Sequence, residues 1–183
     1  MSGRRMARAV AGVLLALALS LPAGAQDGQG PQIGVPWLAK VSYVVDGDSI
    51  WVRPVAGGPR VRLRIDGVDA PEICQSHGTE SRQVLQALAL NQRVRVTVWA
   101  RDRYGRAIAS VVLVQAEVDL GQRMVAEGWA WTDGYGARLG KYWQDEAAAR
   151  WAGKGLFAER WPETPADFRH RHGPCTALPA AAR

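Results

Sequence analysis

The chain has 183 residues, of which 48% are hydrophobic and 22% are charged. This length and composition indicate one globular domain with tails and exclude a wholly disordered chain. Two cysteines exclude a disulfide-rich miniprotein and a four-cysteine zinc module. No apolar run approaches the roughly 20 residues that a membrane-spanning helix needs. The formal net charge of +6 favours a polyanionic partner, although charge alone is a weak indication.

Residues 1–25 are predicted to be a signal peptide. Three arginines precede the apolar stretch Ala9–Leu21, and small residues end the segment at Ala25. A membrane anchor is the alternative interpretation, but 13 apolar residues are short for a span. We therefore expect a secreted or periplasmic protein. Without this segment the net charge falls to +3, so a nucleic-acid partner has to be argued from the site.

The domain proper is predicted to cover residues 38–162, after a flexible leader at 26–37 that is rich in Gly, Pro and Gln. A first strand starts near Ala39, where Val41, Tyr43 and Val45 alternate with their neighbours. Further strands are predicted at 49–55 and 60–65, separated by the turn residues 56–59. In the third strand Val61, Leu63 and Ile65 share one face and the arginines share the other.

A helix is predicted at 79–91, with Val84, Leu85, Ala87 and Leu88 on its apolar side. Strands at 93–101 and 107–114 follow, joined by a hairpin loop at 102–106. Two more helices are predicted, one from about 119–121 to 127 and one from about 138 to 151, and the tail beyond Trp161 is expected to be irregular. Five strands with a helix after the third is the order of an OB-type barrel, although periodicity alone does not single out this fold.

Acidic residues gather in two loops that follow predicted strands. Asp46 and Asp48 lie in one loop, and Asp66, Asp69 and Glu72 lie in the other. If the first three strands form a meander, both loops reach one rim of the barrel. Carboxylate oxygens are hard ligands that select Ca²⁺ or Mg²⁺ over zinc. The alternative is two unrelated acidic turns, because Asp-Gly is a common turn dipeptide.

Two arginines extend this pattern toward phosphodiester chemistry. Arg64 projects from the polar face of the third strand, and Arg106 closes the hairpin. A cation held by carboxylates together with two planar guanidinium groups suits a phosphodiester, and Glu72 is then left to handle a water molecule. The alternative for each arginine is an ordinary surface charge.

The motifs resemble the staphylococcal-nuclease-like (thermonuclease) family in content, order and spacing. They are Asp46-Gly-Asp-Ser49, Val61-Arg-Leu-Arg-Ile-Asp-Gly-Val-Asp-Ala-Pro-Glu72, Asp102-Arg-Tyr-Gly-Arg106, Gly128-Trp-Ala130, and the closing Glu146, Ala149-Arg150 and Gly155-Leu-Phe157. The resemblance covers about residues 38–161. It implies an α+β fold, namely a five-stranded OB-fold barrel with three helices. It also implies a Ca²⁺-dependent phosphodiesterase that acts on DNA and RNA and leaves 3′-phosphate ends.

The resemblance also implies roles for individual residues. Asp48 and Asp69 are expected to be side-chain calcium ligands, and the backbone carbonyl of Ala70 a third ligand, with Asp46 behind them. Arg64 and Arg106 are expected to hold the scissile phosphate. Glu72 is expected to orient or deprotonate the attacking water.

Some positions depart from the family pattern or stay open. Ser49 stands where threonine is commoner, and Tyr135 is the candidate for packing on a nucleotide. Trp129, Trp131 and Trp143 are either stacking surfaces for bases or packing residues. The alternative functions are a non-catalytic OB-fold nucleic-acid-binding module and a structural domain stabilised by calcium. A monomer is the default expectation.

The two cysteines, Cys74 and Cys175, are expected to form a disulfide in an oxidising compartment. Four zinc ligands, with His77 and His172 added to the cysteines, are the rival interpretation, and free thiols are a third. We expect the disulfide to tie the tail to the loop that carries Glu72.

Overall fold

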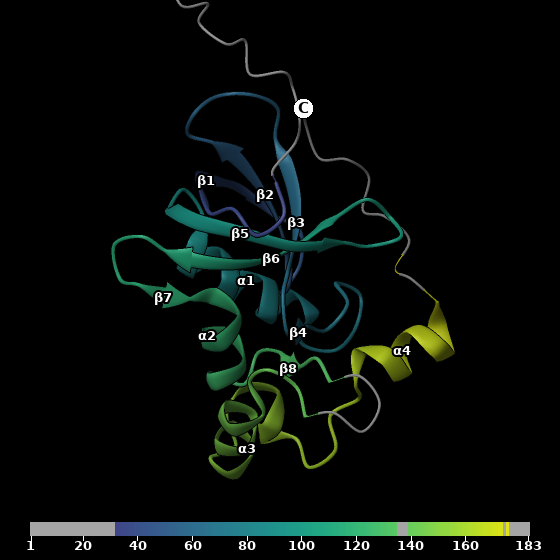
Figure 1. The fold of residues 1–183 in the computed structure, drawn as a ribbon. Helices are drawn as coiled ribbons and strands as arrows, with labels where there is room; N and C mark the ends of the chain where they lie inside the picture. The colour runs from purple at the N-terminus through teal and green to yellow at the C-terminus, as the bar shows by residue number, and fades with distance from the viewer. Residues whose placement is uncertain (1–31, 135–138, 174, 176–183) are drawn as a thin grey trace, which may run out of the picture.

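The barrel is built from five strands in the order β3-β2-β1-β5-β6, and a parallel pairing of β3 with β6 closes it. The computed structural model describes residues 32–134, 139–173 and 175. Figure 1 shows the barrel above the helices. The strands are β1 (Trp37–Val44), β2 (Ser49–Pro54), β3 (Val61–Ile65), β5 (Arg93–Arg101) and β6 (Ala107–Leu113). The predicted five-stranded α+β barrel is confirmed.

The alternation of side chains in β3 and β5 accounts for the interior of the barrel. Leu63 and Ile65 are buried, and Val94, Val96 and Val98 are fully buried as predicted. β-Branched residues at every second position place one apolar row inside and leave the other row for solvent.

The predicted alternation in the first strand is wrong after Val41. The register between β1 and β2 shifts between Val41 and Tyr43. This irregularity shifts the pairing by one residue and exchanges the inward and outward positions, so Val44 is buried while Tyr43 is 42% exposed. A one-residue slip exchanges the two faces of a strand, and nothing in the local pattern indicates where it occurs.

Three helices correspond to those predicted, with corrections in detail. They are α1 (Gly78–Ala89), α2 (Leu120–Ala126) and α3 (Trp143–Trp151). In α1 the buried residues are Gly78, Ser81, Leu85 and Ala89, so the predicted inward position of Ala87 is wrong.

α3 begins later than the predicted start near residue 138. Tyr142, directly before α3, is hydrogen-bonded to β8 (Trp131–Thr132), because its amide donates to the Thr132 hydroxyl at 2.9 Å. β8 in turn pairs with the short strand β4 (Val68–Asp69) below the barrel. The structure also has a short strand β7 (Val118–Asp119) and a 3₁₀ turn at Gly155–Ala158.

The tail contains a fourth helix, α4 (Pro165–His172), so the prediction of an irregular segment is wrong there. The Thr164 side chain caps its first turn by accepting from the Asp167 amide, and Pro165 occupies the first turn. These are ordinary helix-start signals. α4 lies at the lower right of Figure 1, below the level of the barrel strands.

The predicted signal peptide lies outside the described residues. The chain before β1 contacts the barrel where Gly34 donates its amide to the Val98 carbonyl at 2.8 Å. Among the described helices, none is both long enough and apolar enough to cross a membrane.

Candidate active site

Strand register brings the predicted arginines and the first acidic loop together. Ser49, directly after Asp48, pairs with Arg64 across β2 and β3. Leu63 pairs with Ala107 across the parallel closure, which places Arg106 beside Arg62, two residues before Arg64 on β3. Segments that are distant in sequence therefore meet where the barrel closes.

Arg64 bridges the two predicted calcium ligands. Its Nη1 donates to Asp48 Oδ2 at 2.7 Å, and its Nη2 donates to Asp69 Oδ1 at 3.0 Å and to the Val68 carbonyl at 3.1 Å. Burial by itself lowers the pKa of the Arg64 guanidinium, but the charges of Asp48 and Asp69 outweigh it and raise that pKa above its ordinary value. Arg64 is therefore permanently charged.

Asp48 is 4% exposed and accepts three hydrogen bonds. Its Oδ2 also accepts from the Ala70 amide at 3.1 Å, and its Oδ1 accepts from the Ser49 hydroxyl at 2.8 Å. Asp46 lies behind it, with Oδ1 accepting from the Asp48 amide at 3.0 Å. Burial and the negative charge of Asp48 raise the pKa of Asp46 to about 8. Two carboxylates this close repel each other, and the raised pKa of Asp46 relieves the repulsion because Asp46 keeps its proton near neutral pH.

The hairpin loop fixes Arg106 through Asp102. The Arg106 Nε donates to Asp102 Oδ2 at 2.6 Å, and the Arg106 and Tyr104 amides both donate to Oδ1 at 2.9 Å. Burial raises the pKa of Asp102, but these hydrogen bonds outweigh it and hold the pKa below the ordinary value. Because the anchor uses Nε, the end of the guanidinium is left to face the neighbouring hollow.

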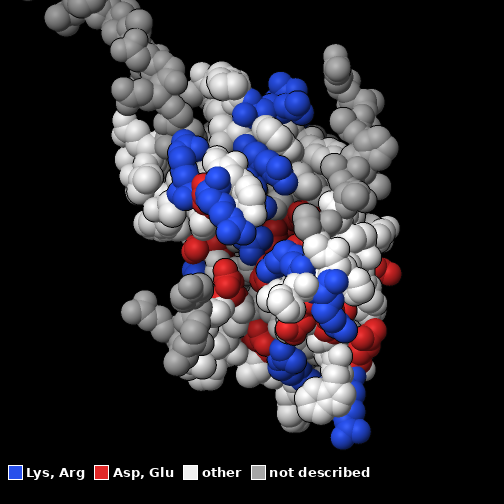
Figure 2. Space-filling view, turned by 90° about the vertical axis from the view of Figure 1, so that its right-hand side faces the viewer, with Lys and Arg blue, Asp and Glu red and all other residues white. Residues whose placement is uncertain are grey.

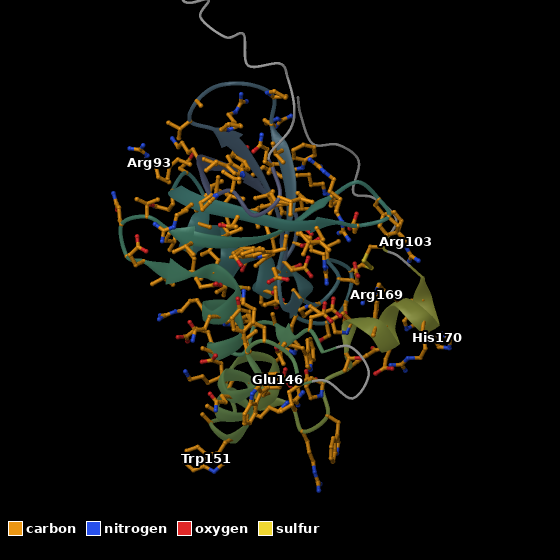
Figure 3. All side chains as sticks on the ribbon, in the orientation of Figure 1. Arg93, Arg103, Glu146, Trp151, Arg169 and His170 are labelled. Carbon is orange, nitrogen blue, oxygen red and sulfur yellow. A yellow bond between two sulfur atoms is a disulfide. The ribbon has the colours of Figure 1, made fainter. Side chains whose placement is uncertain are left out.

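Glu72 contacts an arginine that sequence reasoning missed. Arg169 of α4 donates from Nη1 to Glu72 Oε1 at 2.9 Å and to Asp69 Oδ1 at 3.2 Å, and from Nη2 to Asp69 Oδ2 at 3.0 Å. Figure 3 shows Arg169 between α4 and the barrel, with His170 on the outer side of the helix. Arg169 was missed because the tail was expected to be irregular. The helix-start signals Thr164 and Pro165 are nevertheless present in the sequence.

The predicted disulfide between Cys74 and Cys175 is present. It joins the loop that carries Glu72 to the segment after α4, as expected. The zinc interpretation is wrong, because both thiols are oxidised and His77 Nε2 lies 2.7 Å from Glu159 Oε1.

These side chains surround one open hollow of about 470 Å³. Figure 2 shows acidic groups surrounded by arginines and lysines on the face that carries α4. The lining residues are Asp46, Asp48, Arg62, Arg64, Ala70, Pro71, Glu72, Arg103, Tyr104, Arg106 and Arg169. Of the predicted site residues, only Asp69 does not line the hollow, and it is joined to it through Arg64 and Arg169.

The donor chemistry of this cluster fits a hard divalent cation, because it consists of carboxylates and nearby backbone oxygens. The pair formed by Asp48 and Asp69 is however already bridged by a guanidinium. Within the described residues, no three Asp, Glu, His or Cys side chains are grouped as ligands around a common point. The oxygen donors therefore fit calcium. In this structure, however, the carboxylates of Asp48 and Asp69 are paired with Arg64.

The aromatic residues that were considered as stacking surfaces for bases differ in their burial. Trp131 is 6% exposed and packs edge-on against Phe157, so it is a packing residue. Trp129 packs against the core, and Trp143 is 44% exposed. Tyr135 lies outside the described residues. Trp143 is thus the exposed member of the three predicted tryptophans, and its ring is available to solvent.

Comparisons with known proteins agree with this architecture. The family described as staphylococcal nuclease homologue matches residues 61–159. An uncharacterized endonuclease of Escherichia coli O157:H7 is 34% identical, over 72% of this chain and 84% of that protein. An uncharacterized endonuclease of Haemophilus influenzae is 30% identical, over 72% of each chain. A probable endonuclease LCL3 of Uncinocarpus reesii is 30% identical, over 73% of this chain and 58% of that protein.

The chain is a member of the staphylococcal nuclease homologue family. Its relatives are named endonucleases, which supports the interpretation of this chain as a nuclease enzyme. The family match ends at residue 159 and so does not include α4 or Arg169.

Proposed function

We propose that this protein is an exported, calcium-dependent nuclease that hydrolyses phosphodiester bonds of DNA and RNA and leaves 3′-phosphate ends. The observation that carries the proposal is that Arg64, Arg106, Glu72 and the buried Asp48 line the same hollow. Family membership and relatives named endonucleases support the same chemistry. The disulfide is compatible with an oxidising compartment outside the cytoplasm. The proposed enzyme acts as a monomer.

Calcium is assigned to the side chains of Asp48 and Asp69 and the carbonyl of Ala70. When bound there, it supplies positive charge to a non-bridging phosphate oxygen and so favours attack at phosphorus. Asp46 supports this set through its hydrogen bond from the Asp48 amide.

The arginines bind and stabilise the reacting phosphate. Arg106 is anchored through Nε, which leaves its two Nη groups for phosphoryl oxygens. Arg64 uses three of its five N–H groups on acceptors among the described residues, and the others are directed to the phosphate. Negative charge on these oxygens increases in the transition state, so both residues contribute to rate more than to binding.

Glu72 accepts the proton of the attacking water, or orients it, at the carboxylate that faces the hollow. Water attacks phosphorus in line with the 5′ oxygen, the bond to that oxygen breaks, and the phosphate stays on the 3′ side. The 5′ oxygen leaves as a hydroxyl after taking up a proton.

The test is a digest of plasmid DNA and of a defined RNA, with calcium and with a calcium chelator, followed by end-group analysis of the products. We expect cleavage only with calcium, 3′-phosphate ends, and loss of cleavage in the Glu72→Gln and Arg106→Ala double variant. Arg123→Ala is the matched control, because Arg123 lies on α2 and pairs with Glu127, just past the end of that helix. Products with 5′-phosphates contradict the mechanism. Binding of nucleic acid without cleavage identifies the alternative, a non-catalytic OB-fold module.

A further inference from the structure

Arg169 places a positive charge beside two of the carboxylates that the proposed reaction needs, Asp69 and Glu72. Its guanidinium makes a two-pronged contact with Asp69 and reaches Glu72 with the same Nη1 group. The side chain is 40% exposed, against 15% for Asp69 and 25% for Glu72. Solvent therefore screens the carboxylates only in part, and the attraction is stronger than at an open surface.

Two contacts hold the helix that carries Arg169 against the site. The disulfide joins Cys175, beyond the end of α4, to Cys74. Before the start of the helix, the Gln75 side-chain amide donates to the Glu163 carbonyl at 2.7 Å, and Gln75 Oε1 accepts from the Glu72 amide at 3.1 Å within the loop. Both ends of α4 are thus attached to the loop of Glu72, and Arg169 lies between the attachments.

We propose that Arg169 is an internal counter-ion that competes with the divalent cation for Asp69, while it also pairs with Glu72. This inference rests on the proposed function. Calcium and a guanidinium repel each other, and both seek the same carboxylate oxygens. Arg169 must therefore withdraw from Asp69 when the cation binds, and the free energy of its ion pairs is subtracted from the free energy of calcium binding. Arg169 thereby sets the calcium concentration at which the site fills.

The disulfide makes this competition effective. A tethered guanidinium stays at a high local concentration beside its carboxylates, whereas a helix attached at one end spends more time away from them. Reduction of the disulfide is then expected to weaken the Arg169 pairs and to tighten calcium binding. The effect of reduction must pass through Arg169 and so must vanish when that residue is replaced.

The chain offers a matched control on the same helix. Arg171 forms an ion pair with Glu163 and has no recorded contact with Asp69 or Glu72 among the described residues. Loss of Arg171 removes the same formal charge from α4 without removing a competitor for the carboxylates.

The experiment is a calorimetric titration of calcium into the full chain, without nucleic acid. The variants are wild type, Arg169→Gln, Arg169→Lys and Arg171→Gln, each oxidised and reduced. We expect the calcium Kd of Arg169→Gln to fall by about tenfold, in the range of ordinary coupling between sites. Arg169→Lys is expected to give a smaller fall, because an ammonium cannot bridge as the guanidinium does. Arg171→Gln should match wild type.

The outcomes separate this inference from the proposed function. Equal calcium Kd values in wild type and both Arg169 variants overturn the competition, while calcium-dependent cleavage by the same samples leaves the nuclease proposal standing. Absence of both calcium binding and cleavage in every variant overturns both. If reduction changes the Kd of wild type and of Arg169→Gln alike, the tether does not act through Arg169 and that part is wrong.

Discussion

Arg64 and Arg106 are anchored by opposite parts of the guanidinium group. Arg64 is held by both Nη groups, between Asp48 and Asp69, whereas Arg106 is held by Nε against Asp102. The first arrangement fixes the carboxylates relative to each other. The second fixes one edge of the guanidinium and directs the other edge outward.

Replacing Arg106 with lysine is expected to lower kcat by about 100-fold, with a smaller change in KM. An ammonium keeps the charge but cannot bind two phosphoryl oxygens while also holding Asp102. Steady-state cleavage of a defined oligonucleotide measures both constants, with Arg123→Lys as the control. A kcat near that of wild type contradicts the assignment.

The ion pair of Asp102 predicts a pH dependence of stability. Its folded-state pKa lies below the ordinary value of 3.8, so its contribution is complete above that value and is lost as the pH falls through the folded pKa. Asp102→Asn is therefore expected to unfold more easily than wild type at neutral pH. The difference should shrink below pH 3.8 in urea titrations monitored by tryptophan fluorescence, and a constant difference across that range contradicts the ion pair.

The sequence predicts most of this site but not Arg169. The motif residues converge because each lies in or beside a strand of one small fold, and strand order is readable from alternation. Arg169 reaches the site only because a tail helix docks beside it, which no periodicity encodes. The pairing of Cys74 with Cys175 and the capping residue Thr164 were the available signals.

At the scale of elements, glycines decide how α2 meets the end of α3. Gly128 has φ +75°, and a Cβ there would lie 2.3 Å from the Lys154 carbonyl oxygen. The Leu156 amide donates to the Gly128 carbonyl at 2.8 Å. The Gly128-Trp129-Ala130 motif is therefore a packing requirement that positions β8, and through it β4 with Asp69.

The bulge in β1 and the late start of α3 show the reverse case, in which tertiary contacts override the local sequence pattern.

Gly128→Ala is expected to lower the free energy of unfolding by about 2 kcal/mol or more, because it adds a backbone clash to the left-handed conformation. Gly57→Ala is the control. Gly57 has φ +96° but nothing within 4 Å of its added Cβ, so only the conformational cost applies. Urea denaturation measures both, and equal losses in the two variants contradict the packing argument.

For the whole molecule, the disulfide closes a loop between residues 101 apart in sequence. In the chain-entropy account, closing a loop of this length stabilises by up to about 4.7 kcal/mol. The disulfide also holds α4 in place, so that Arg169 lines the hollow. The rest of the fold is secured by the barrel core.

The Cys74→Ser and Cys175→Ser double variant is therefore expected to melt about 10 °C lower, since 1 kcal/mol corresponds to about 2–4 °C in a domain of this size. Differential scanning calorimetry of the oxidised and reduced protein provides the measurement. Wild type in reductant should match the double variant, and an unchanged Tm in both contradicts a stabilising role.

The parallel seam between β3 and β6 determines when during folding the hollow can exist. Every other pairing in the barrel is antiparallel, and β3 reaches β6 only across α1 and β5. Contacts between such distant segments form late, after local hairpins. Until that seam forms, Arg64 and Arg106 belong to separate pieces of chain. Under the proposed function, a nascent or partly unfolded chain in which this seam has not formed lacks the assembled site and is not expected to cleave nucleic acid.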